Sequence, residues 1–131
     1  MMIKLFVTDI DGTLLPAGSG IVPAKNVEAV QAMTRAGVKV VIATGRMYKA
    51  ALPIAKQLGE QIPIIAYNGA LIKSSAGEVL HAQYMDEAIA LKLINFFEER
   101  DWHLHSYSGE VLYVPKRNEC VELYEKSQKV E

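Results

Sequence analysis

The fold is decided by residues 3–13, which read IKLFVTDIDGT. Residues 3–8 are mostly apolar and rich in strand-forming types, and two acidic residues and a glycine follow. A continuous apolar run of this length is typical of a strand that is buried on both faces. We therefore expect a buried strand at residues 3–8, with Asp9 and Asp11 directly after it.

Downstream of this strand, helical and strand-like patterns alternate. Pro23 opens a helical pattern that a glycine ends, and an apolar strand follows at residues 38–43. A second helical pattern covers residues 46–58, where Pro53 predicts a kink or a late start, and a third apolar strand covers residues 63–66. Strands that alternate with helices of this length predict an α/β fold with a parallel sheet.

Beyond residue 70 the pattern changes to hairpins and separate helices. Two hairpins are predicted, at residues 70–82 and 103–114. Asp86 is a suitable N-cap for a helix between them, and Asn118 caps a final amphipathic helix. We expect the first of these helices to face inward with four apolar side chains, Ile89, Leu93, Phe96 and Phe97.

The composition argues against several classes of partner. Fourteen Lys and Arg residues against fifteen Asp and Glu residues give a net charge of −1, which leaves no basic excess for a nucleic-acid backbone. No apolar stretch approaches the roughly 20 residues that a membrane helix needs. We therefore expect neither nucleic acid nor a membrane as a partner. The single cysteine, Cys120, excludes an internal disulfide and is typical of the reducing cytoplasm, where we expect this protein.

Polar residues follow each of the three expected parallel strands. Asp9 and Asp11 follow the first, residues 44–46 follow the second, and Asn68 with Gly69 follows the third. Right-handed crossovers bring the carboxyl ends of such strands to one edge of the sheet, and open α/β sheets bind ligands at that edge. We therefore expect the three clusters to form one site.

The stretch DIDGT at residues 9–13 suits two kinds of chemistry. Alternate side chains of an extended segment point the same way, so Asp9 and Asp11 share a face. Paired carboxylates hold a hard cation such as Mg²⁺, or divide the work of nucleophile and general acid–base. Gly12 lets the backbone turn so that successive N–H groups face an anion. A calcium-type loop or a plain turn is the alternative, but the distal glutamate of the calcium loop is missing.

Three short motifs make the chain resemble the haloacid dehalogenase-like (HAD) phosphohydrolases. DIDGTLL at residues 9–15 resembles their first signature, and ATGR at residues 43–46 resembles their second in the form of the Cof-type subfamily of sugar-phosphate phosphatases. YNGA at residues 67–70 is also similar to that subfamily. The resemblance implies a three-layer, Rossmann-like core with a parallel sheet, of which residues 1–82 form an incomplete N-terminal part. It implies that residues 83–131 begin an α+β cap, inserted after the third strand.

The resemblance also implies roles for the site residues. Asp9 would be the nucleophile that forms an aspartyl-phosphate, and Asp11 the acid–base that protonates the leaving alcohol and then activates water. Mg²⁺ would bridge Asp9 and the phosphate, with the backbone carbonyl of Asp11 as a further metal ligand. A carboxylate approaches a phosphate dianion only when a cation reduces their repulsion. The phosphate or substrate would be bound by Gly12, Thr44, Gly45, Arg46, Asn68 and Gly69.

Several of these binding residues have a structural alternative. Thr44 binds phosphate with the Gly45 amide at the start of the second helix, or it is only the N-cap of that helix. Arg46 reaches the substrate, or it is a solvated residue of the first helical turn. Asn68 and Gly69 contact the substrate, or they form a plain turn.

Other reactive side chains are assigned structural roles. His103 and His105 have no third metal ligand in view, so a polar surface is expected there. Lys116 and Arg117 are expected to be a solvated charge pair. Cys120 lies on an amphipathic helix, where packing is the expected role.

The family pattern is incomplete in this sequence. The resemblance places a phosphate-binding lysine and a Gly- and Asp-rich metal loop after the cap, and the sequence reaches Glu131 without them. We therefore expect the N-terminal part of a Mg²⁺-dependent phosphatase of small, sugar-phosphate-like esters, whose first strand is an exposed edge prone to association. Its partners would be a small phosphorylated metabolite and either the missing C-terminal part or a second copy.

Two other classes of function remain open at this point. One is a non-catalytic fragment that only assembles with a partner or binds phosphate. The other is a phosphoacceptor receiver domain, which also pairs acidic residues after its first strand. A receiver needs its phosphoacceptor aspartate after the third strand, where this chain has Ala66-Tyr67-Asn68.

Overall fold

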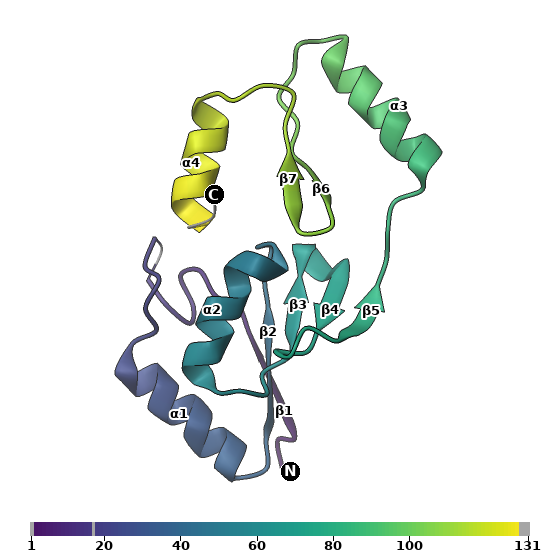
Figure 1. Cartoon of the computed structure of the whole chain (residues 1–131). Coiled ribbons are helices and arrows are strands. Elements are labelled where there is room, and N and C mark those ends of the chain that lie inside the picture. Colours follow the sequence, from purple (N-terminus) through teal and green to yellow (C-terminus); the bar gives the residue numbers. More distant parts are fainter. Residues whose placement is uncertain (1, 17, 129–131) are drawn as a thin grey trace. The chain divides into compact units, whose positions relative to one another are not determined.

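The computed structural model describes residues 2–16 and 18–128, and the chain divides into two compact units, residues 1–82 and residues 83–131 (Figure 1). Unit 1 contains β1 (Leu5–Thr8), α1 (Ala24–Arg35), β2 (Lys39–Ala43), α2 (Tyr48–Leu58), β3 (Ile64–Ala66), the 3₁₀ turn η1 (Tyr67–Gly69), β4 (Leu71–Lys73) and β5 (Val79–Ala82). Unit 2 contains α3 (Glu87–Glu98), β6 (Ser106–Ser108), β7 (Val111–Tyr113) and α4 (Glu119–Gln128). The assignment of the two units as core and cap stays a prediction.

Unit 1 is built on a five-stranded sheet in the order β1-β2-β3-β4-β5. Strands β1, β2 and β3 are parallel, and the hairpin of β4 and β5 extends the sheet in antiparallel fashion. Helix α1 connects β1 to β2, and α2 connects β2 to β3. The α/β fold with parallel pairing is therefore confirmed, and the carboxyl ends of the three parallel strands lie at one edge of the sheet.

The core of unit 1 lies between the two helices and one face of the sheet. The register pairs Thr8 with Ile42 and Ile42 with Ile64, and all three side chains are buried. Residues of α2 pack into the same cluster, as the sequence pattern predicted: Tyr48, Ala51, Ala55 and Leu58 are buried and Leu52 is partly buried. Both helices therefore cover the same face of the sheet, which Figure 1 also shows.

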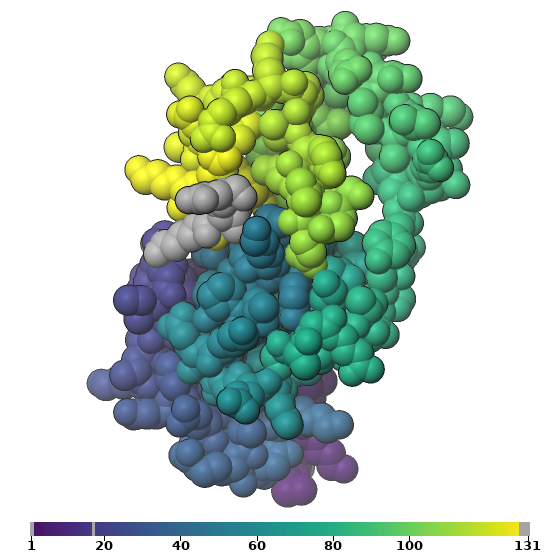
Figure 2. All heavy atoms as spheres, in the orientation of Figure 1, coloured from purple at the N-terminus to yellow at the C-terminus, as the bar shows by residue number. Residues whose placement is uncertain are grey.

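Strand β1 is an exposed edge, so the expectation that it is buried on both faces is wrong for this chain. Leu5, Phe6 and Val7 are 54%, 37% and 48% exposed. In the described part of the chain no strand pairs with the outer side of β1, and within unit 1 both helices pack on the face opposite Leu5 and Val7. The N-terminal segment, purple in Figure 2, accordingly reaches the surface of unit 1. The exposed edge that the incomplete family pattern predicted is confirmed.

The ends of the two core helices are set by local chemistry. Gly37 has a φ of +82° and follows α1; its N–H donates to the Thr34 carbonyl, and the next N–H donates to the Met33 carbonyl. This Schellman arrangement confirms the predicted helix stop. Helix α2 begins at Tyr48, two residues later than predicted, and runs through Pro53. None of the helices in the described ranges has the length and apolar character that crossing a membrane requires.

Unit 2 contains two capped helices and a hairpin. The Asp86 carboxylate accepts the N–H groups of Ala88 and Ile89 at 3.0 and 3.2 Å. The Asn118 side chain accepts those of Cys120 and Val121 at 3.0 and 3.2 Å. Both predicted N-caps are therefore confirmed.

The predicted inward face of α3 is not buried. Ile89, Leu93 and Phe96 are exposed, and α3 has no buried residue. The physical reason is that the only sheet in the described part of unit 2 has two strands, β6 and β7, which is too little surface to cover a helix face. Helix α3 carries the predicted apolar residues, but the described residues of this unit provide no surface that buries them.

Two further expectations for unit 2 are corrected by the structure. His103 and His105 are half-buried rather than part of a polar surface, with ring centroids 4.6 Å apart, and the His105 ring also packs against Tyr124. Cys120 is exposed, so packing is not its role.

Candidate functional site

The loop after β1 turns back on itself through Gly12. The N–H of Gly12 donates to the Leu15 carbonyl at 2.9 Å, and the N–H groups of Thr13, Leu14 and Leu15 all donate to the Ile10 carbonyl. Gly12 has a φ of +76°, which favours glycine. The expectation that successive N–H groups here face an anion is wrong, because the amides of residues 12–15 are used within the loop.

The two predicted catalytic carboxylates differ in their surroundings. Asp9 is exposed, and in the described part of the chain its carboxylate makes no hydrogen bond or ion pair; its backbone carbonyl accepts the Thr8 hydroxyl at 3.0 Å. Asp11, two residues on, is held by an arginine from the loop after β2. One carboxylate is therefore available to a ligand, and the other is engaged within the protein.

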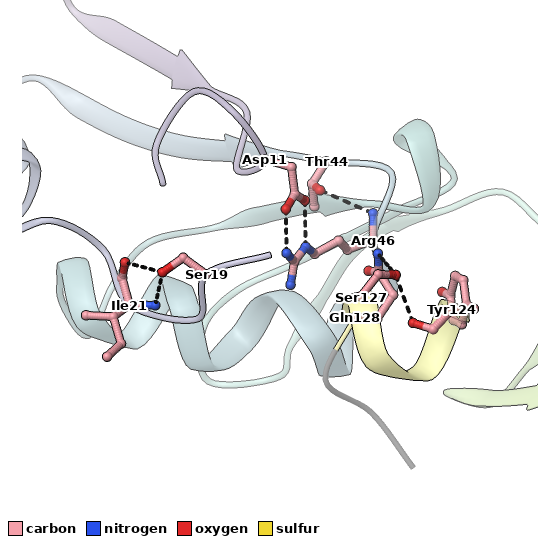
Figure 3. Close-up of polar contacts among 8 residues, drawn as sticks. All are labelled: Asp11, Ser19, Ile21, Thr44, Arg46, Tyr124, Ser127 and Gln128. Carbon is pink, nitrogen blue, oxygen red and sulfur yellow. Dashed lines mark hydrogen bonds and ion pairs between the residues drawn. The ribbon is translucent and has the colours of Figure 1, made fainter. Parts of the chain in front are cut away.

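Arg46 forms a bidentate ion pair with Asp11 (Figure 3). Its Nε donates to Oδ2 of Asp11 at 2.7 Å, and its Nη2 donates to Oδ1 at 2.6 Å. The Arg46 side chain is only 4% exposed, whereas that of Asp11 is 40% exposed. Arg46 is thus not a solvated residue of the first turn of α2, and a buried guanidinium needs a negative partner of this kind.

This ion pair controls the protonation of Asp11. The hydrogen bonds from Arg46 lower the pKa of Asp11 below its ordinary value of 3.8, partial burial opposes them, and the charge of Arg46 adds to the lowering. Asp11 is therefore a carboxylate at neutral pH.

Two hydrogen bonds fix Thr44 in the loop after β2, one to β3 and one to the backbone of Arg46. The Thr44 N–H donates to the Ile65 carbonyl at 2.9 Å, and the buried Thr44 hydroxyl accepts the Arg46 N–H at 3.2 Å. Thr44 is therefore not the N-cap of α2, a position that Met47 occupies. Gly45 lies three residues before α2, so the expectation that its amide opens the helix is wrong.

The loop after β3 is bonded to the loop after β2. The N–H of Tyr67 donates to the Arg46 carbonyl at 3.0 Å, and the N–H of Asn68 donates to the Thr44 carbonyl at 3.2 Å. Tyr67, Asn68 and Gly69 have φ values of +51°, +55° and +104°. A left-handed backbone is uncommon for a tyrosine, and such strained positions cluster at functional sites.

Side-chain and backbone bonds therefore join all three predicted clusters. Asp11 is bonded to Arg46, and the loop of Arg46 is bonded to the loop of Asn68. The pairing of Asp11 with Arg46 was missed in the sequence, although a signal for it existed. The register pairs Thr8 with Ile42, and opposite charges lie three and four residues beyond these positions, in the loops that follow the two adjacent parallel strands.

Comparison with known proteins shows the family of the chain. The sequence profile of the haloacid dehalogenase-like hydrolases matches residues 6–131. The chain therefore belongs to this hydrolase family, and its Cof-type relatives include several named phosphatases.

Two curated relatives and two solved structures illustrate the similarity. The chain is 30% identical to phosphatase YwpJ of Bacillus subtilis over 86% of its own length and 39% of that protein. It is 34% identical to pyridoxal phosphate phosphatase YbhA of Escherichia coli over 80% of its own length and 38% of that protein. The crystal structure of TM0651 from Thermotoga maritima, 30% identical, matches 99% of this chain and 48% of its own chain with a TM-score of 0.83. A haloacid dehalogenase-like hydrolase from B. subtilis, 28% identical, matches 94% and 43% of the two chains with a TM-score of 0.82. The chain thus spans less than half the length of each of these proteins.

Proposed function

We propose that this chain supplies the nucleophile and the acid–base of a Mg²⁺-dependent phosphatase that hydrolyses small phosphate esters through an aspartyl-phosphate. The observation that carries the proposal is the arrangement of the three bonded loops, in which the Asp9 carboxylate has no hydrogen bond among the described residues and the carboxylate two residues further on is held by Arg46. The names of its relatives support a small phosphate ester as substrate, since one is a pyridoxal phosphate phosphatase and another an HMP-PP phosphatase. The exposed thiol of Cys120 suits the reducing cytoplasm as the place of action.

In the proposed first step, a carboxylate oxygen of Asp9 attacks phosphorus and the bond from phosphorus to the alcohol oxygen breaks. Asp11 gives its proton to that oxygen, and the alcohol leaves. In the second step, a water oxygen attacks the phosphorus of the aspartyl-phosphate while Asp11 takes a proton from this water. The bond from Asp9 to phosphorus then breaks, and inorganic phosphate leaves with Asp9 restored as a carboxylate.

The residues present fit a weak Mg²⁺ site. Among the described residues no group of three or more His, Cys, Asp or Glu side chains could hold a metal ion. Mg²⁺ keeps several waters and uses one or two carboxylates together with substrate phosphate oxygens. The free carboxylate of Asp9 and the backbone carbonyl of Asp11 would hold the ion, whose charge would reduce the repulsion between Asp9 and the phosphate.

The surface of β1 supports a further chain segment as a partner. Parallel sheets have both faces covered, but Leu5 and Val7 are about half exposed and the outer side of β1 is unpaired among the described residues. The matched relatives are more than twice as long as the aligned region. We propose that the C-terminal part of such a protein pairs with β1, and that a second copy of the chain takes this place when that part is absent.

The second candidate function is a non-catalytic fragment that assembles or binds phosphate. The lack of a three-residue metal cluster among the described residues favours it. A missing electrostatic stabiliser of the transition state costs about 10²–10³ in rate, so the chain alone is expected to be a slow enzyme.

Turnover of p-nitrophenyl phosphate by the purified chain separates the two candidates. We expect slow hydrolysis that requires Mg²⁺ and is abolished in Asp9→Asn. Asp86→Asn is the matched control, because it removes one carboxylate in unit 2 and asparagine is an equally good N-cap. Hydrolysis that survives in Asp9→Asn would assign the activity elsewhere, and no hydrolysis by any variant would favour the non-catalytic fragment.

A further inference from the structure

We propose that Arg46 exchanges partners: it holds Asp11 until a phosphate ligand binds, then moves to the phosphoryl group, and thereby frees the carboxylate of Asp11. The proposal deepens the function proposed above and rests on it. It makes Arg46 a residue that both positions the acid and binds the ligand.

The ion pair engages both oxygens of Asp11. Each carboxylate oxygen accepts one hydrogen bond from Arg46, at 2.7 and 2.6 Å. A ligand oxygen that approaches Asp11 must therefore compete with two charge-assisted hydrogen bonds. Release of Arg46 removes this competition and frees both oxygens for the ligand.

Arg46 cannot simply be left without an anion. Its side chain is 4% exposed, and a buried charge that loses its partner is strongly destabilising. A phosphate group offers two oxygens in the geometry that a guanidinium binds in bidentate fashion. Phosphate is thus a replacement partner that keeps the charge of Arg46 compensated throughout the exchange.

The backbone of Arg46 is fixed, so the exchange is confined to the side chain. Its N–H donates to the Thr44 hydroxyl at 3.2 Å, and its carbonyl accepts the Tyr67 N–H at 3.0 Å. Figure 3 shows the first of these bonds beside the pair with Asp11. The side chain therefore turns about a backbone that is anchored on both sides.

The direct test is NMR spectroscopy of the wild-type chain during addition of inorganic phosphate with Mg²⁺. We expect the ¹³Cγ signal of Asp11 and the ¹⁵Nε signal of Arg46 to shift along one common saturation curve. The corresponding signals of Arg117 and Glu125 are the control, because this pair is also bidentate but lies on the surface of unit 2. Phosphate binding without a change at Arg46 and Asp11, or no binding at all, would overturn the exchange.

A double-mutant cycle on phosphate affinity tests the same point independently. If Arg46 leaves Asp11 when phosphate binds, Asp11→Asn has two effects in the chain with Arg46: it removes a charge that repels phosphate, and it removes a partner that competes with phosphate for Arg46. In the Arg46→Gln background, Asp11→Asn removes only the repelling charge. The affinity gain from Asp11→Asn should then be larger with Arg46 present, by about tenfold or more. If Arg46 stays on Asp11, it screens that carboxylate, and the gain should be equal or smaller with Arg46 present, which would refute the proposal. Where Arg46→Gln fails to fold, the NMR titration of the wild-type chain decides the point.

Failure of this proposal can be told apart from failure of the proposed function. Phosphorylation of Asp9 tests the function and does not depend on how Arg46 moves. If Asp9 becomes phosphorylated while the ion pair of Asp11 and Arg46 stays unchanged, the exchange is rejected and the proposed function is not.

Discussion

The Asn68 side chain lies so close to Gly45 that a Cβ atom at position 45 would stand 2.9 Å from Asn68 Oδ1. Gly45 follows β2 and Asn68 follows β3, so this contact packs two of the three site loops against each other. Real Cβ atoms do not come so close to other atoms, so any larger residue at position 45 requires the Asn68 side chain to move.

Gly45→Ala should therefore displace the Asn68 side chain. We expect a loss of about 1 kcal/mol in the free energy of unfolding, at the low end for overpacking, because the contacting atom ends a side chain that can turn. The loss should disappear in an Asn68→Gly background, since glycine also accepts the left-handed backbone at position 68. Urea unfolding of the wild type, the two single variants and the double variant measures the effect. An equal loss of stability from Gly45→Ala in both backgrounds would contradict the assigned contact.

The ion pair of Asp11 and Arg46 predicts a dependence of stability on acid. The folded-state pKa of Asp11 is lowered from 3.8, so its stabilising contribution is complete above about 3.8 and is lost as the pH falls through the folded-state value. Arg46→Gln should remove this part of the pH dependence, and Arg117→Gln, at an exposed pair, should leave it in place. Urea unfolding at about pH 6 and about pH 3 compares the variants. Equal acid sensitivity of Arg46→Gln and wild type would exclude the assigned cause.

A second titration is expected in unit 2. Burial lowers the pKa of His105 from 6.5, and the nearby His103 adds to the effect. The unfolded state therefore binds more protons than the folded state just below 6.5, and the stability of unit 2 should fall as the pH drops through that value. The fluorescence of Trp102, the single tryptophan, can follow this unfolding. His105→Gln should weaken the dependence and His81→Gln, in unit 1, should not; the reverse order would contradict the account.

The exposed edge of β1 predicts self-association of the chain. Val7→Lys places a charge on this edge and should shift the chain toward a monomer. Val79→Lys is the matched control, because Val79 is an equally exposed valine on β5, the opposite edge strand. Light scattering coupled to size-exclusion chromatography measures the change. A wild-type chain that stays monomeric at all concentrations would contradict the proposed role of β1.

Much of the secondary structure of the two units could be predicted because its signals are local. The alternation of strands and helices, the stop at Gly37 and the caps at Asp86 and Asn118 each depend on a few neighbouring residues. The meeting of the three loops also followed from topology, because parallel strands end at one edge.

What the sequence did not reveal depends on partners distant in the chain. Arg46 finds Asp11 only through the pairing of β1 with β2, and the amides after Gly12 are occupied because the loop closes on itself. Burial of β1 and α3 was overestimated for another reason: an apolar pattern records what a segment needs to cover it, and the covering surface is not among the described residues. A pattern of apolar side chains therefore predicts which face of a strand or helix is apolar better than it predicts which part of the protein covers that face.

The central claim is that Asp9 is the residue that accepts the phosphoryl group. Its most direct test is to incubate the chain with p-nitrophenyl phosphate and Mg²⁺, quench with acid and locate the added phosphoryl group by peptide mass spectrometry. The account predicts a phosphoryl group on Asp9 in the wild type and in Asp86→Asn. It predicts one in Asp11→Asn as well, because p-nitrophenolate leaves without a proton donor, and none in Asp9→Asn. A phosphoryl group on another residue, or labelling that persists in Asp9→Asn, would contradict it.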